Sequence, residues 1–139
     1  MKSVNRAKPR GSRSGVSMIE CAIVLPLFAM LVLGILEFGR AFMVSQVVTN
    51  SAREGARIGT MPTSTSNSQI EARVNDFLAD AGITTATTTV SVDSGSLAGA
   101  SRGDAVTVQV SVPFTDVSLL SPRFLEGINL TSTSVMRRE

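Results

Sequence analysis

One long apolar run constrains this chain more than any other feature. From Cys21 to Leu36 there are sixteen consecutive uncharged residues, and counting from Val16 extends the segment to twenty-one residues with one acid, Glu20. At about 1.5 Å per residue, a helix of the longer segment covers roughly 30 Å, the thickness of a bilayer's hydrocarbon core. A cleavable secretory signal is shorter and ends in a small-x-small site, which the residues after Gly34 do not offer. The run therefore predicts a single-pass transmembrane helix.

The charges are distributed unevenly around this run. Five of the thirteen basic side chains precede Val16 and all eleven acids follow it, so the net charge of +2 becomes −3 once residues 1–15 are set aside. The positive-inside rule then predicts a cytoplasmic N-terminus and an extracytoplasmic remainder. The chain beyond the run also lacks Trp and Tyr and has no basic cluster except Arg137-Arg138. This composition argues against nucleic-acid binding.

The start of the run carries a recognisable motif. A basic leader is followed by Gly15, four residues and then Glu20, which opens the apolar block. This arrangement resembles the class III signal of type IV prepilins. The resemblance implies that a prepilin peptidase cuts between Gly15 and Val16, and that Glu20 neutralises the α-amino group of Val16 on a neighbouring subunit. A plain interfacial position is the alternative for Glu20.

Two further strings extend the resemblance to about residue 59: Leu33-Gly-Ile-Leu-Glu-Phe-Gly-Arg-Ala-Phe42 and Thr49-Asn-Ser-Ala-Arg-Glu-Gly-Ala-Arg57. They are similar to the N-terminal region of TadE-like proteins, which are minor pilins or pseudopilins of tight-adherence (Flp pilus) assembly. The resemblance implies that residues of the first string pack against other pilin-like helices. These helix-packing candidates are Gly34, Glu37, Phe38, Arg40 and Phe42. The family motif of the second string consists of Ala52, Arg53, Glu54, Gly55, Ala56 and Arg57.

The helical pattern continues beyond the apolar run. A helix is predicted from about Ser17 to Ile58, with Gly59 and Pro62 as stop signals. Small and apolar residues recur every three or four positions, which predicts one packing face. The members of this predicted face are Phe38, Ala41, Phe42, Ser45, Ala52 and Ala56. The pattern leaves open whether this face packs on the chain's own domain or on neighbouring subunits.

The rest of the chain predicts a small α+β domain. Ser68 and Glu71 have the spacing of a capping box, and Gly82 is the expected end of a short helix. The expected apolar face of this helix comprises Ile70, Val74, Phe77, Leu78 and Ala81. Alternating residues predict strands at Thr87–Asp93, Asp104–Val112 and Ile128–Met136. The fold class is therefore α+β, with one short helix on an antiparallel sheet of about three strands and a division into residues 1–15, 16–60 and 61–139.

The composition does not favour an enzyme. There is no His, no cysteine pair and no cluster of acids at metal-ligand spacing, so we expect no catalytic site, metal or cofactor. We expect a structural component of a pilus assembly or secretion system in the bacterial cytoplasmic (inner) membrane, with its domain on the periplasmic side. Its partners would be the membrane, a prepilin peptidase, other pilin-like subunits and the pilus assembly machinery. The alternative is a signal-anchored binding module that keeps its leader.

Overall fold

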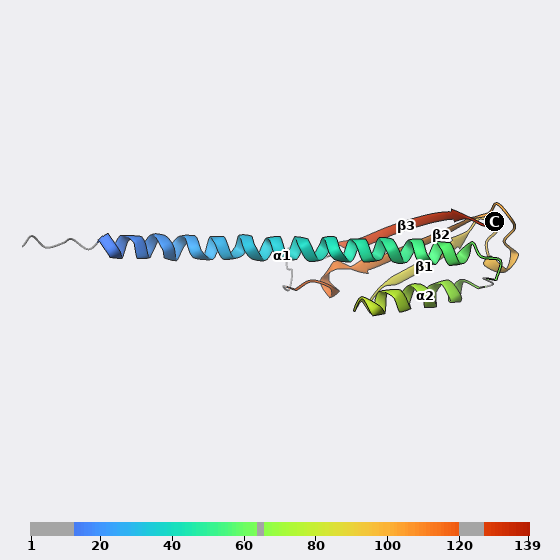
Figure 1. Ribbon diagram of the computed structural model, residues 1–139, viewed down its shortest axis with the longest axis horizontal. Helices are drawn as coiled ribbons and strands as arrows, with labels where there is room; N and C mark the ends of the chain where they lie inside the picture. Colours follow the sequence, from blue (N-terminus) through green and yellow to red (C-terminus); the bar gives the residue numbers. More distant parts are fainter. Residues whose placement is uncertain (1–12, 64–65, 120–126) are drawn as a thin grey trace, which may run out of the picture. The chain divides into compact units, whose positions relative to one another are not determined.

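The computed structural model describes residues 13–63, 66–119 and 127–139. In these residues two α-helices, three strands and two short 3₁₀ segments follow one another along the chain (Figure 1). The helices are α1 (Arg13–Gly59) and α2 (Asn67–Asp80), and the strands are β1 (Thr87–Val92), β2 (Ala105–Pro113) and β3 (Asn129–Arg137). The 3₁₀ segments are η1 (Leu97–Gly99) and η2 (Phe114–Asp116). The α+β class and the three-stranded antiparallel sheet are confirmed.

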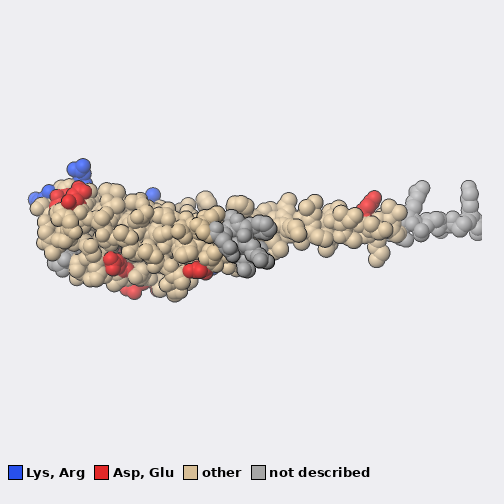
Figure 2. All heavy atoms as spheres, turned by 180° about the vertical axis from the view of Figure 1, so that it is seen from behind, with Lys and Arg blue, Asp and Glu red and all other residues tan. Residues whose placement is uncertain are grey.

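Helix α1 runs from before the apolar segment to Gly59, the predicted stop signal. The chain divides into two compact units between Leu36 and Glu37, so α1 contributes to both. In the first unit, the apolar side chains from Val16 to Leu36 are exposed, and by length and composition α1 qualifies as a helix able to cross a membrane. An exposed apolar helix of this kind suggests a membrane anchor. Figure 2 shows this part of the helix largely tan, with acidic atoms near its start, and Glu20 is the acid in its sequence.

Helix α2 differs from its prediction at its start. It begins at Asn67, its N-cap is Ser66, and that side chain makes no capping hydrogen bond, so the predicted capping box of Ser68 and Glu71 is wrong. The hydroxyl of Ser66 instead lies 3.0 Å from that of Ser68. The end of α2 agrees with its prediction, because Gly82 has a positive φ of 77° as a Schellman motif requires.

The Schellman motif is completed by two backbone hydrogen bonds. Gly82 N–H donates to the Ala79 carbonyl at 2.8 Å, and Ile83 N–H donates to the Leu78 carbonyl at 2.9 Å. The face of α2 is narrower than predicted: Ile70, Val74 and Leu78 are buried, whereas Phe77 and Ala81 are exposed. Positions 70, 74 and 78 are each four apart, so they form a single row along the helix.

The three strands pair in chain order, β1-β2-β3, and both pairings are antiparallel. Val108 of the central strand stands opposite Val90 of β1 and Ser134 of β3. Alternation along β2 puts its four even-numbered valines on one face, where all are fully buried. The outer face carries Thr, Ser and Gln from all three strands. Strand boundaries agree with the predictions to within one residue, because period-two alternation defines which residues face the core.

The core lies between this valine face and the two helices (Figure 1). Helix α2 supplies its buried row, and α1 supplies a second row. The α1 core residues are Val44, Val48, Ala52 and Ala56. Of the two possibilities left open by the sequence, packing of the continued helix on its own domain is therefore shown. Burying a valine contributes roughly 1.5–3 kcal/mol, so the four β2 valines are a major part of the domain's hydrophobic stabilisation.

Candidate functional site on helix α1

The Glu-Phe-Gly-Arg string, Glu37 to Arg40, binds a distant segment of the chain. Glu37 is only 9% exposed. Its carboxylate accepts hydrogen bonds from the Ser118 hydroxyl and from the Leu119 N–H, the latter at 3.3 Å. A buried carboxylate is stable only when donors replace its lost water, and these two donors do so. Glu37 therefore fixes the chain directly after η2.

Arg40 holds the same segment from the next turn of the helix. Its Nε donates to the Val117 carbonyl at 2.7 Å, and the side chain is half-buried. Residues 37 and 40 lie on one side of a helix because they are three apart. The carboxylate of Glu37 and the guanidinium of Arg40 thus hydrogen-bond to three consecutive residues, Val117 to Leu119. We call Glu37, Arg40 and residues 117–119 the latch.

The second string serves close packing. Ala52 and Ala56 are fully buried, and Gly55 stands between them at the crossing with α2. A Cβ atom added to Gly55 would lie 2.6 Å from Val74 Cγ2 and 3.1 Å from Val108 Cγ1. Only a residue without a Cβ fits there unless its neighbours shift. The small residues of this string allow α1 to approach both α2 and the sheet.

The charged residues of the second string lie on the surface. Arg57 donates two hydrogen bonds to the carboxylate of Glu54, at 2.9 and 2.8 Å. The hydrogen bond from Arg57 is the largest cause that lowers the pKa of Glu54 below its ordinary value, and the charge of Arg73 adds a smaller effect in the same direction. Arg53 is exposed. An exposed pair of this type contributes little to stability.

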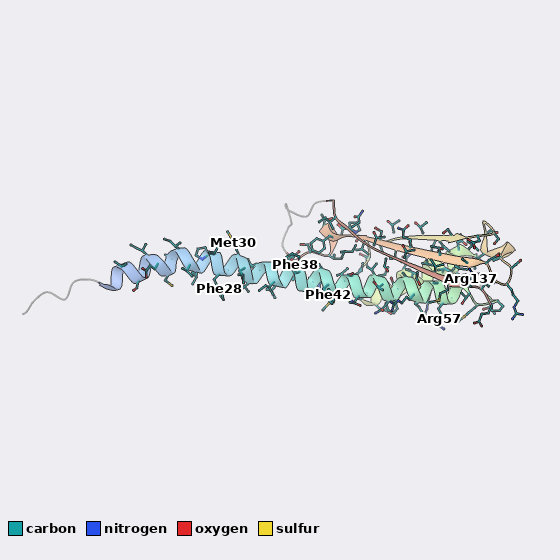
Figure 3. All side chains as sticks on the ribbon, turned by 90° about the horizontal axis from the view of Figure 1, so that it is seen from above. Phe28, Met30, Phe38, Phe42, Arg57 and Arg137 are labelled. Carbon is teal, nitrogen blue, oxygen red and sulfur yellow. The ribbon has the colours of Figure 1, made fainter. Side chains whose placement is uncertain are left out.

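The predicted packing face of α1 is only partly covered by the protein's own domain. Phe38 is 77% exposed and Phe42 is 70% exposed, while Ala52 and Ala56 are buried. The α1 residues that pack in the core are Val44 and Val48, together with Ala52 and Ala56. Phe38 and Phe42 are labelled in Figure 3. The residues of the exposed face and those of the buried face both recur every three or four positions, and both faces carry apolar residues between Glu37 and Gly59. Periodicity alone therefore could not decide which face is covered by the domain.

The other predicted residues lie on the exposed apolar helix. Gly15, Val16, Glu20 and Gly34 belong to α1 within the first unit, and nothing lies within 4 Å of a Cβ atom added to Gly15 or Gly34. The predicted leader falls largely outside the described residues, since these begin at Arg13. In the described part of the chain, no group of three or more His, Cys, Asp or Glu residues is placed to hold a metal ion.

The partners of the latch were not found from sequence. Val117, Ser118 and Leu119 follow η2 and carry no motif, and only their folded position identifies them. The TadE-like protein family model matches residues 15–57, less than half of the 139-residue chain. The match includes the prepilin-like start, the latch residues of α1 and the small-residue string, so the predicted TadE-like resemblance is confirmed there. No curated protein and no solved structure matches the chain.

Proposed function

We propose that this protein is a membrane-anchored minor pilin or pseudopilin-like component of a tight-adherence (Flp, type IVb) pilus assembly or secretion system. The observation that carries the proposal is the exposed apolar helix of residues 16–36, which lies within the TadE-like match. The same helix continues into a folded domain. In this function the protein has a structural role, without catalysis or a cofactor.

The two sides of α1 support this function differently. One side from Glu37 to Gly59 is occupied by the protein's own domain through the latch and the small-residue string. The apolar side chains before Glu37, together with Phe38 and Phe42, are exposed. In the proposed assembly these positions pack on other pilin-like subunits. Gly34 permits close approach of a neighbouring helix, because a small residue lets two backbones come together.

The Gly15-to-Glu20 motif at the start of α1 supports a charge pair between subunits. Glu20 would pair with the α-amino group that cleavage creates at Val16 of a neighbouring subunit. Two opposite charges in a low-dielectric layer are favourable only when both are satisfied together. The five basic residues of the leader support a cleavage site on the cytoplasmic side of the inner membrane and a sheet domain on the periplasmic side, because positive charges favour the cytoplasmic side of a span.

The alternative is a signal-anchored binding module that keeps its leader. It is compatible with a domain that forms a compact unit from Glu37 onward. Processing separates the two functions, because only an assembled pilin-like subunit needs the new amino group at Val16.

The test is intact-mass analysis of protein extracted from host membranes that contain a prepilin peptidase. The proposed function requires a chain that begins at Val16, and Gly15→Leu should abolish processing while the precursor remains in the membrane. The matched control is Ser17→Leu, which introduces the same side chain two residues away and should still be cut. Recovery of the unprocessed wild-type chain alone would favour the anchored module.

A further inference from the structure

The unit that begins at Glu37 has two unlike sides. In Figure 1, α2 lies along one side of α1 and β3 along the other, and the segment after β2 lies on the side of α2. Glu54 marks this side of α1, because the charge of Arg73 in α2 lowers the Glu54 pKa. Arg40 marks it too, through its hydrogen bond to Val117. We call the two sides the α2 side and the β3 side.

Apolar side chains are exposed on the β3 side. At about 100° per residue, Phe38 and Phe42 fall roughly 120–160° around the α1 axis from Glu54, away from α2. Ile128 directly precedes β3 and is 47% exposed. Its carbonyl accepts a hydrogen bond from Phe114 at 2.9 Å, which continues the β2–β3 ladder and places Ile128 in the core-facing row of β3. We call Phe38, Phe42 and Ile128 the apolar patch.

The α2 side carries one exposed leucine at the same level. Leu119 is 65% exposed and belongs to the α2 side, because Val117 in the same segment binds Arg40. Its N–H donates to the carboxylate of Glu37 at 3.3 Å. Glu37 and Phe38 are neighbours in α1, so Leu119 and the apolar patch lie at the same level of α1 on its opposite sides.

Two charges without partners are divided between the sides in the same way. Arg53 is exposed and falls roughly 100° around α1 from Glu54, in the same direction as the phenylalanines, so it turns to the β3 side. Glu71 precedes Arg73 by two residues, which turns it roughly 200° around α2 and away from α1. Among the described residues, neither the Arg53 nor the Glu71 side chain has a hydrogen-bond or ion-pair partner.

These two charges also match in level along α1. A Cβ atom added to Gly55 would lie 3.3 Å from Ile70 Cγ2, so the start of α2 is beside the last turns of α1. Glu71 directly follows Ile70, and Arg53 is two residues from Gly55. The β3 side thus presents an apolar patch and a cation, and the α2 side presents an apolar side chain and an anion in the same order along α1.

We propose that a second copy of this chain docks on the β3 side through its own α2 side, with the two copies in the same orientation. Leu119 of the second copy then contacts the apolar patch, and its Glu71 pairs with Arg53. The charge complementarity of the two sides favours a second copy as the occupant. Because the two surfaces differ, the contact leaves a free surface at each end and extends from copy to copy into a ring or a filament.

This inference names the partner of the surface that the proposed function leaves to other subunits. It rests on the proposed function only for the common orientation of the copies, which follows when the copies share one membrane. It does not require cleavage at Gly15.

Disulfide cross-linking between two differently tagged copies tests the contact. Both full-length copies carry Cys21→Ser, and one carries Phe38→Cys while the other carries Leu119→Cys. The copies are co-expressed in host membranes and oxidised with copper phenanthroline, and the cross-linked pair is isolated through both tags. A disulfide needs Cα atoms within about 7 Å, so the pair reports direct contact. The matched control combines Leu119→Cys with Val135→Cys, an exposed apolar position on the outer face of the sheet.

Charge reversal then identifies the two surfaces. Arg53→Glu on the Phe38→Cys copy, or Glu71→Arg on the Leu119→Cys copy, places like charges across the contact and should lower the cross-linked fraction several-fold. The two reversals together restore opposite charges and should recover the original fraction, which misfolded variants could not do. As a control, the same two substitutions are exchanged between the copies. They then lie on the surfaces outside this contact and should leave the fraction unchanged.

The inference requires the cross-link, its loss on each reversal and its recovery in the combination. Cross-linking of Phe38→Cys no stronger than that of Val135→Cys would overturn it. Single reversals without effect, or a loss that the combination does not recover, would overturn it as well. Intact-mass analysis of the same membranes reports cleavage at Gly15 separately. Processed chains that do not cross-link would therefore end this inference and leave the proposed function standing.

Discussion

The carboxylate of Glu37 accepts a hydrogen bond from the hydroxyl of Ser118, a residue 81 positions later in the chain. This contact connects the first turn after the apolar run to the segment that follows η2. Arg40 adds a second connection to the same segment. In this chain the charged residues of the Glu-Phe-Gly-Arg string therefore have partners within their own domain.

Removing the charge of Glu37 should loosen the latch. In Glu37→Gln an amide N–H₂ replaces one of the two carboxylate oxygens, so it faces either the Ser118 or the Leu119 donor. Losing a hydrogen bond to a buried charge costs about 1–3 kcal/mol. We expect a lower unfolding free energy for the full chain in detergent micelles and faster hydrogen exchange at residues 117–119. The control is Glu54→Gln, the same change at the surface of the same helix, which should lower the unfolding free energy much less and leave exchange at residues 117–119 unchanged. Equal effects of the two substitutions would contradict the role of Glu37.

Two glycines of α1 should respond in opposite directions to alanine. Replacing a helical glycine gains up to about 1 kcal/mol of helix propensity. At Gly39 nothing lies within 4 Å of an added Cβ, so Gly39→Ala should stabilise the chain by about this amount. At Gly55 the added Cβ lies 2.6 Å from Val74 Cγ2, and overpacking costs about 1–3 kcal/mol. Gly55→Ala should therefore be destabilising in the same unfolding assay. Stabilisation by both changes would show that the side chains around Gly55 can shift to accept a Cβ atom at little cost, which contradicts the prediction.

The Glu54–Arg57 pair should be visible in a pH titration. The folded-state pKa of Glu54 is lowered from 4.5, chiefly by the hydrogen bond from Arg57. The stabilisation is therefore present above the unfolded-state pKa and is lost as the pH falls through the folded-state pKa, below about 4.5. Arg57→Gln should raise the Glu54 pKa measured by carboxyl ¹³C NMR. The control is Arg53→Gln, which removes an exposed arginine beside Glu54 and should leave most of the shift. No difference between the two variants would refute the pairing.

Glu20→Ala should separate membrane insertion from assembly. A carboxylate costs about 2.5–3.5 kcal/mol at the centre of a span and less toward its end, so its removal leaves insertion intact or improves it. The proposed partner, the α-amino group of Val16 on a neighbouring subunit, would lose its countercharge. We expect reduced co-purification of other pilin-like subunits with a tagged variant. Ser17→Ala, one turn away, is the control. Unchanged co-purification would make Glu20 a plain interfacial residue.

The sequence predicted the elements whose pattern has a single interpretation. Alternation at Val106, Val108 and Val110 allows one buried face, and the strand bounds agreed to within one residue. The uncharged run and Gly59 likewise predicted α1 and its end, although the helix begins at Arg13 and not at Ser17. The spacing could not show which part of the predicted α1 face the domain covers, because the exposed Phe38 and Phe42 share the three-to-four spacing of the buried Ala52 and Ala56. An apolar side chain that stays exposed has the same sequence pattern as one that is buried.

The latch could be predicted only in part. Glu37 and Arg40 were candidates for packing because they belong to the TadE-like string, but their partners are backbone and hydroxyl groups that carry no signature. The capping box failed for a local reason, since α2 begins before Ser68 and leaves that residue inside the helix. Contacts across 81 residues depend on the completed sheet, which short-range patterns do not describe.

The separation between Glu37 and Ser118 also sets an order in time. A ribosome releases Glu37 long before it makes Ser118, so α1 emerges while the strands that will cover Val44 and Val48 do not yet exist. These valines and the Glu37 carboxylate must therefore remain without their native neighbours until β2 and the residues after η2 have been synthesised. Because residues 117–119 are made about 80 positions after Glu37, closure of the latch is a late event in the protein's biogenesis.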